Sequence, residues 1–422
     1  MSSERLFEIT ATTLFTLALI HTFLTGYLTK QSYRFKEGSV SENFLHLFGE
    51  VEIVFGFWSA ILIVLGMILI DFDYINRYLN SRNFTEPLFV FVIMVVCSTR
   101  PIVKTAERIL VKISSLIPID SRISVFFTIL FVAPLLGSLI TEPAAMTISA
   151  FLLLPRYFTK LHSSRFKYAT VALLFLNISI GGTLTPFAAP PILMVSGKWG
   201  WDLQFMLTHF ASKTIIATFL NTLILTFIFK KEILKGKTEY SLGEKLNLPI
   251  LVIVVHLIFL FLIIITSHYP ILFIGLFLFF VGFLKATHEY QSKLSLREPL
   301  LVGFFLAGLI VIGGPQRWWL EPIIISLNKY QLYFGAIGLT AFTDNAALTY
   351  LGSLIPNLDF DSKLALVKGS VVGGGLTLIA NAPNPAGYGI LRNSFENGVF
   401  SPLRLLLWSL PLTIITAIVF LL

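Results

Sequence analysis

Long apolar runs separated by short polar loops dominate the chain. Runs of about 20 apolar residues predict membrane-spanning helices. Two further apolar stretches, 121–158 and 331–356, are interrupted near their centres by Glu142 and Asp344, and their arms are short for a crossing. We therefore expect two re-entrant helical hairpins, each of which enters and leaves by one face of the membrane. The ten predicted spans are 7–28, 47–70, 86–104, 167–192, 203–229, 248–267, 270–286, 298–313, 364–384 and 402–421.

Composition agrees with this pattern. Of the 422 residues, 55% are hydrophobic and 13% are charged, whereas soluble domains carry about 25% charged residues. The chain is therefore predicted to be an all-α polytopic membrane protein. Its net charge of +8 does not indicate a nucleic-acid partner, because the basic residues lie in short loops between apolar runs.

Loop charge predicts the orientation of the chain. With two re-entrant hairpins, the loops on one face contain 21 Lys and Arg residues and those on the other contain 7. Basic loops face the cytoplasm, so the mouth of the first hairpin is expected in the cytoplasm and that of the second outside. Both chain termini are then expected outside.

The two hairpin centres resemble each other. The segment Thr141-Glu142-Pro143-Ala144-Ala145-Met146-Thr147 aligns with Thr343-Asp344-Asn345-Ala346-Ala347-Leu348-Thr349, 202 positions later. Glycine-rich segments beginning at Gly181 and Gly373 follow them, each succeeded by prolines. An odd number of crossings separates equivalent elements, so the halves are expected to be inverted repeats.

The repeat divides the chain into four predicted parts. An extra N-terminal transmembrane helix lies in 1–46, and the first repeat, with hairpin 121–158, occupies 47–229. A cytoplasmic loop and a linker helix fill 230–269. The second repeat, with hairpin 331–356, occupies 270–422.

Broken helices in matched positions point to a binding site. Inverted repeats with glycine- and proline-interrupted helices are typical of secondary transporters. Unwound backbone at membrane depth is tolerated only where it meets protein, water or a bound ion. Glycine and proline also kink packed helices, but four breaks in matched positions favour a common site at the midplane.

Glu142 and Asp344 are the main candidates for chemistry. Charged residues inside a membrane are costly and are functional candidates by default. A carboxylate beside hydroxyls and backbone carbonyls offers the hard oxygen ligands that suit sodium, and it can take up a proton when the ion leaves. Each acid could also cap a helix N-terminus, and both roles can hold together. Glu142, Asp344 and Asn345 are the predicted sodium ligands.

Neutral side chains around the breaks could complete the site, although Ser and Thr in membrane helices often bond to their own backbone. Basic residues near the spans could neutralise the acids. Arg100 could pair with Glu142, Glu50 or Glu52, or extend to the headgroups, and Glu50 and Glu52 are interpreted as interfacial. The further candidate ligands are Thr141, Thr147, Thr185, Thr343, Thr349, Thr377, Asn381 and Asn384, and the charge-compensating candidates are Arg100, Lys213 and Lys368.

Signatures of enzymes are missing from the sequence. It has no zinc-protease His-Glu-x-x-His, no phosphate-binding glycine loop and no nucleophile elbow. We expect neither catalytic residues nor a cofactor, and the histidines show no paired spacing for a metal.

The hairpin tips and the run Ala380-Asn381-Ala382-Pro383-Asn384-Pro385-Ala386-Gly387 resemble the ion transporter superfamily. This group includes D-type sodium/proton antiporters, arsenite permeases and divalent anion/sodium symporters, and the chain most resembles its bacterial sodium/proton antiporter family. The resemblance covers nearly the whole chain. It implies tips that meet at the midplane, a homodimer, and a transport domain that moves against a scaffold. In the symporters the tips resemble Ser-Asn-Thr, whereas acids stand here, which favours proton coupling.

The predicted function is exchange of sodium for protons across the bacterial inner membrane by alternating access. One alternative is a sodium- or proton-coupled transporter of a small anion, such as a dicarboxylate or an arsenite-like species. Another is an intramembrane enzyme that modifies lipid. Antiport needs titratable acids at the site, an anion carrier needs a buried unpaired cation, and an enzyme needs a nucleophile or a metal set.

Overall fold

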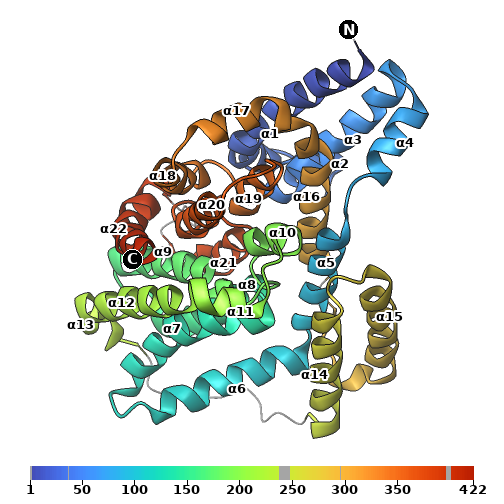
Figure 1. Cartoon of the computed structure of the whole chain (residues 1–422). Coiled ribbons are helices and arrows are strands. Elements are labelled where there is room, and N and C mark those ends of the chain that lie inside the picture. The colour runs from blue at the N-terminus through green and yellow to red at the C-terminus, as the bar shows by residue number, and fades with distance from the viewer. Residues whose placement is uncertain (1, 37, 237–247, 295, 396–400) are drawn as a thin grey trace.

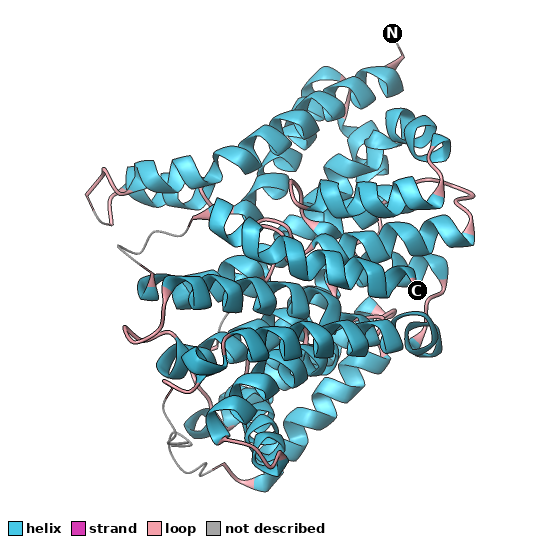
Figure 2. Ribbon diagram, turned by 90° about the vertical axis from the view of Figure 1, so that its left-hand side faces the viewer, coloured by secondary structure: helices cyan, strands magenta, loops and turns pink. Residues whose placement is uncertain are grey.

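A computed structural model describes residues 2–36, 38–236, 248–294, 296–395 and 401–422. Helices and connecting loops account for all of these residues (Figure 2), which confirms the all-α prediction for the part described. The first half contains α1 (Ser3–Ser32), α2 (Val40–Phe48), α3 (Val51–Leu69), α4 (Phe72–Asn80), α5 (Thr85–Cys97), α6 (Arg100–Leu116), α7 (Ser121–Ile140), α8 (Glu142–Tyr157), α9 (Ser164–Gly181), α10 (Pro190–Trp199), α11 (Leu203–Met206), α12 (Ser212–Ile228) and α13 (Lys230–Ile233). The second half contains α14 (Ile250–Ile265), α15 (Pro270–Ala286), α16 (Arg297–Gly313), α17 (Arg317–Ser326), α18 (Lys329–Thr340), α19 (Asn345–Ser353), α20 (Phe360–Gly373), α21 (Asn384–Leu391) and α22 (Pro402–Leu421).

Among the described residues, seven helices are long and apolar enough to cross a membrane, or eight if the bent pair α5 and α6 is one span. The chain is therefore a multi-pass membrane protein with fewer full-length helices than the ten spans predicted. Three predicted spans contain shorter helices, since α14 has 16 residues, α15 has 17 and α20 has 14. Conversely, α7 has 20 residues and is long enough to cross, although the sequence placed it in the arm of a hairpin.

The predicted span 86–104 is bent in the structure. Helix α5 ends at Cys97, α6 begins at Arg100, and the two axes differ by 69°. Pro101 lies in the first turn of α6, where a proline lacks the amide hydrogen that would continue the preceding helix. The remainder of α6 alternates basic and apolar residues in a helical period, which suits the edge of a membrane better than its centre.

Both predicted hairpin centres are sharp turns between helices. Thr141 alone joins α7 to α8, whereas residues 341–344 join α18 to α19. Thr141 has φ 74°, a positive value that threonine rarely adopts. The first tip thus holds a strained backbone, a feature that clusters at functional sites.

Both predicted helix breaks are also present. Helix α9 ends at Gly181 and α20 ends at Gly373, and the chain runs without α-helix to α10 and α21 respectively. A Cβ on Gly181 would lie 2.5 Å from the Pro134 carbonyl oxygen, and one on Gly373 would lie 2.7 Å from the Ile337 carbonyl oxygen. Glycine at each break therefore lets the backbone approach the first helix of its own hairpin.

The two halves pack crosswise. Helix α8 of the first hairpin contacts α21 of the second half, and α19 of the second hairpin contacts α10 of the first half. The helices that precede the hairpins also pack between the halves, since α3 contacts α16 and α5 contacts α15. Figure 1 shows α8, α10, α19, α20 and α21 grouped in the middle of the molecule, with α14 and α15 at one side.

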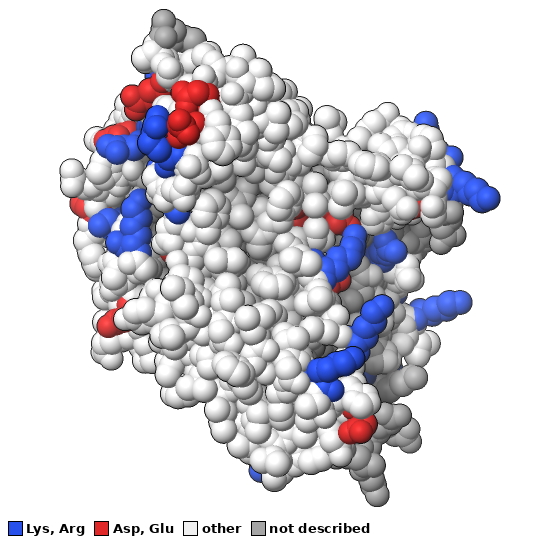
Figure 3. All heavy atoms as spheres, turned by 90° about the vertical axis from the view of Figure 1, so that its right-hand side faces the viewer, with Lys and Arg blue, Asp and Glu red and all other residues white. Residues whose placement is uncertain are grey.

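The outer surface has a broad uncharged band. On the face shown in Figure 3, Lys, Arg, Asp and Glu gather toward two opposite sides, with mostly uncharged surface between them. Large apolar side chains are also exposed on α14 and α15, such as Ile250 and Ile271, which are 79% and 87% exposed. Such a surface is suited to contact with lipid chains.

Candidate functional site

Glu142 is completely buried at the first tip. It opens α8, and its Oε2 atom accepts a hydrogen bond of 2.9 Å from the side-chain amide of Asn381, which belongs to the second broken segment. A Cβ on Gly182 would lie 2.6 Å from Oε1 of Glu142. The Glu142 carboxylate thus lies against the broken segment of the first half and accepts a hydrogen bond from the broken segment of the second half.

Asp344 occupies the corresponding tip in a different way. It caps the N-terminus of α19, and its Oδ1 atom accepts hydrogen bonds from the backbone amides of Ala346 and Ala347, at 2.7 and 3.3 Å. The predicted capping role of Asp344 is therefore confirmed, and its role as an ion-binding acid stays a prediction.

Asn345 anchors the second tip to both halves. Its backbone amide donates a hydrogen bond of 3.1 Å to the Ala380 carbonyl, and its side-chain amide lies 3.3 Å from Oγ of Ser179 on α9. The hydroxyl of Ser179 in turn donates to the Val371 carbonyl on α20, at 2.7 Å. The second tip and the two broken helices are thereby joined.

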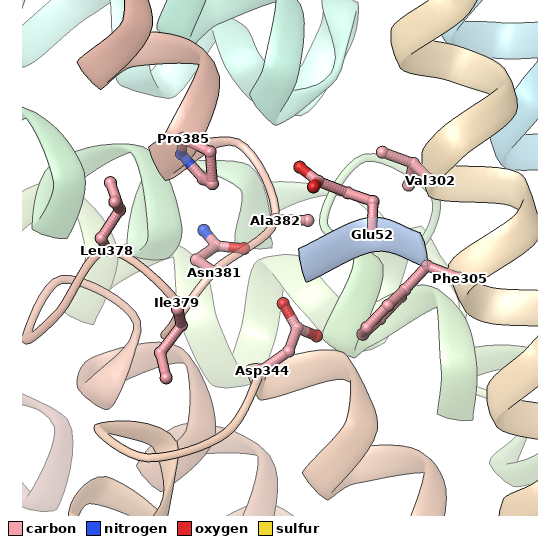
Figure 4. Close-up of a pocket in the computed structure, with 9 residues that line it drawn as sticks. All are labelled: Glu52, Val302, Phe305, Asp344, Leu378, Ile379, Asn381, Ala382 and Pro385. Atoms are coloured by element: carbon pink, nitrogen blue, oxygen red, sulfur yellow. The ribbon is translucent and has the colours of Figure 1, made fainter. Parts of the chain in front are cut away.

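A small hollow adjoins the second tip. Its lining brings together Asp344, the broken segment at Asn381 and Ala382, and Glu52 from α3. In Figure 4 the Asp344 carboxylate points toward Asn381 and Ala382, and the Glu52 side chain extends toward the same segment. Asp344 is close enough to interact electrostatically with both Glu52 and Glu142. Three acids therefore surround the region where the tips meet the breaks.

Glu52 was missed as a site residue in the sequence. It lies in the first turn of a predicted span, next to Glu50, and was interpreted as interfacial. In the structure Glu50 forms an ion pair with Arg297, whereas Glu52 lines the hollow. Two positions along a helix differ by about 200° in direction. This periodicity within the predicted span 47–70 was the one available signal, although in the structure α3 begins at Val51 and Glu50 precedes it as the N-cap.

Five buried oxygen atoms around the tips lack a hydrogen-bond partner among the described residues. An uncompensated polar atom at membrane depth is costly, and carboxylate, amide and hydroxyl oxygens are ligands for hard cations. No group of three or more His, Cys, Asp or Glu side chains suited to a metal occurs in the described part, so neutral oxygens would have to complete a sodium site. The five atoms are Thr141 Oγ1, Glu142 Oε1, Asn345 Oδ1, Asn381 Oδ1 and Asn384 Oδ1.

Four of the predicted threonine ligands donate their hydroxyls to backbone carbonyls. Thr147 bonds to Pro143 and Thr349 to Asn345 and Ala346, so both serve their own helices. The other two, Thr185 and Thr377, each connect a broken segment to the hairpin of the same half. Thr185 bonds to the Ser138 carbonyl at 2.6 Å, and Thr377 bonds to the Ala341 carbonyl at 3.0 Å.

The amide of Asn384 similarly closes the second break on itself, through the carbonyls of Gly374 and Thr377. Thr343 is half-buried immediately before Asp344. As ligands of an ion, all of these residues remain predictions.

The basic candidates lie apart from the hollow beside Asp344. Arg100 lines a different hollow, at the bend between α5 and α6. Lys368 on α20 interacts electrostatically with Lys213 on α12 and with Asp361. None of the three lines the hollow that holds Glu52 and Asp344, so their role as charge compensators stays a prediction.

Comparison with known proteins addresses the identity of the chain. No curated protein matches it in sequence. A family model described as "Putative Na+/H+ antiporter" matches residues 6–422. This match includes both tips, both breaks and Glu52, and it points to a transporter rather than an enzyme. The chain belongs to this antiporter family.

Proposed function

We propose that the chain exchanges sodium for protons across the bacterial inner membrane by alternating access. The observation that carries the proposal is the set of unpartnered buried oxygens where the two tips meet the two breaks. Asp344 and Asn345 would bind sodium, with oxygens of Glu142, Asn381 and Asn384 nearby. When sodium binds, the carboxylates lose their protons, and when sodium leaves they are protonated again.

The charge of the hollow supports a cation over a small anion. Among the described residues that line it are two carboxylates and no basic side chain. An anion carrier needs a buried cation beside its substrate, because an unpaired anion at membrane depth is costly. The hollow beside Asp344 therefore favours cation exchange.

Crosswise packing supports the inverted repeat and the alternating-access cycle. The bond from Asn381 to Glu142 joins the second break to the first tip, and the contact of Asn345 with Ser179 joins the second tip to a first-half helix. A shift of one half would then alter the ligands on both tips. The cytoplasmic mouth of the first hairpin, the outer position of both termini and the homodimer also stay predictions.

The direct test is transport by the purified full chain in proteoliposomes. With a pH gradient imposed, addition of sodium should move protons across the membrane, as detected by a fluorescent pH probe. Addition of choline at the same ionic strength is the control. If sodium and choline give the same signal over the pH range of 6 to 9, the proposed exchange is wrong. Small anions supplied as choline salts test the alternative in the same vesicles.

A further inference from the structure

A second hollow, of about 350 Å³, lies where α5 bends into α6. One wall is the bend itself, with Thr99 and Arg100. The other wall is the end of α15 and the segment after it, with Lys285, His288 and Lys293. No Asp or Glu occurs among the described residues that line this hollow. The site is therefore strongly basic, unlike the hollow beside Asp344.

These cations are not neutralised by neighbours within the described part of the chain. Arg100, Lys285 and Lys293 have no ion pair there, although nearby basic residues do. Lys104, one turn along α6, pairs with Glu107 at 2.7 Å, and Arg297 pairs with Glu50. An anion that enters this hollow therefore meets cations that no ion pair within the described part already neutralises.

The backbone adds to this preference. Helix α6 has 17 residues and begins at Arg100, and the Thr99 side chain does not cap it. Free amides at the start of a helix attract phosphate and other anions. Thr99 and Arg100 at the start of α6 both line the hollow, so the helix N-terminus adjoins the basic side chains.

Part of the lining is apolar. Val281 on α15 is 36% exposed, and Leu284 and Leu294 complete an apolar strip beside the lysines. Figure 3 shows how broad the uncharged surface of this face is next to its basic side chains. A ligand with a phosphate head and a hydrocarbon body matches both the basic side chains and the apolar strip, whereas a free phosphate matches only the basic side chains.

We infer that this hollow binds the phosphate group of an anionic lipid. Basic hollows between membrane helices on the cytoplasmic side are suited to such headgroups, and loop charge predicts that this face is cytoplasmic. Helix α6 contacts α7, α8 and α14. A lipid held at the bend thus braces the helix that packs against the first hairpin. This inference does not depend on the proposed ion exchange.

The test measures lipid binding to the full chain in detergent by native mass spectrometry. The wild type should bind phosphatidylglycerol more tightly than phosphatidylcholine. The triple variant R100Q/K285Q/K293Q should bind phosphatidylglycerol roughly 100-fold more weakly, since each basic residue contributes about fivefold. The matched control K30Q/K112Q/K231Q removes three exposed cations that lie outside the hollow, and it should bind like the wild type.

Single variants keep the test decisive if the triple variant does not fold, because each should lose about fivefold in affinity. Equal binding of phosphatidylglycerol by the R100Q/K285Q/K293Q and control proteins would overturn the inference, as would equal binding of the two lipids by the wild type. Inorganic phosphate is added in a separate arm. If it raises the unfolding temperature as much as phosphatidylglycerol does, the hollow holds soluble phosphate and the lipid assignment is wrong.

Discussion

The two hairpin tips carry similar sequences but hold their acids differently. Asp344 caps its helix and accepts bonds from backbone amides of its own tip, and it faces a hollow shared with Glu52. Glu142 lies within the first turn of its helix, and its one hydrogen-bond donor among the described residues, Asn381, comes from the other half of the chain. The Asp344 carboxylate is therefore fixed by backbone amides of its own tip, whereas the Glu142 carboxylate is fixed by a side chain from the other half.

This difference follows from the length of the side chain and its position. An aspartate at an N-cap reaches the amides of the next turn and is fixed by them. A glutamate in the first turn, one methylene longer, extends away from its own backbone. We infer a division of labour in which Asp344 mainly binds sodium and Glu142 couples the state of one half to the other.

The largest effect is expected from Asp344→Asn. Asparagine keeps the cap and a neutral oxygen, but it cannot exchange a proton. Sodium-dependent proton movement in proteoliposomes should therefore disappear, while the unfolding temperature stays near that of the wild type. Asp359→Asn is the matched control, because Asp359 caps α20 in the same manner and is outside the site. Normal exchange by the Asp344→Asn variant would remove Asp344 from the mechanism.

Glu52→Gln should have the next largest effect. This change removes a negative charge from the hollow, which should lower the apparent sodium affinity roughly tenfold at low ionic strength. The matched comparison is Glu50→Gln, two residues before Glu52. This change breaks the ion pair of Glu50 with Arg297 but leaves the lining of the hollow intact. The quantity measured is the sodium concentration at half-maximal exchange. An equal change in the two variants would show that Glu52 acts only through surface charge.

Gly182→Ala tests how tightly the Glu142 carboxylate is held. The added Cβ would lie 2.6 Å from Oε1, so the carboxylate must move. We expect exchange to slow by about fivefold, the equivalent of about 1 kcal/mol, in a folded protein. Gly197→Ala is the control, since its Cβ would meet nothing nearer than 3.6 Å. Unchanged exchange in both would mean that the position of Glu142 is not critical.

Much of this arrangement could be predicted from single residues in the sequence. Glu142 and Asp344 interrupt apolar runs, and Gly181 and Gly373 begin the segments that break α9 and α20, so both tips and both breaks were found. The bend after Cys97 was not, because Ser98, Thr99 and Arg100 before Pro101 were interpreted as the cytoplasmic end of a span and do not specify the 69° turn.

Contacts between residues that are far apart in the chain could not be predicted from the sequence either. Asn381 and Glu142 are 239 positions apart, and no local pattern links two such residues. Glu52 was assigned to the interface because an acid at the start of a span has the same sequence pattern whether it faces the headgroups or a hollow. Its direction depends on the packing of α3 against α16.

The most direct test of the proposed competition is sodium affinity as a function of pH. Sodium binding to the purified protein is measured from pH 6 to pH 9 in the wild type and in Glu142→Gln. If sodium and protons compete for the tip carboxylates, the wild-type affinity rises with pH until deprotonation is complete. In Glu142→Gln the loss of a neighbouring negative charge should move this rise toward lower pH. A wild-type affinity that stays flat from pH 6 to pH 9 would contradict direct competition and favour the transport of a small anion.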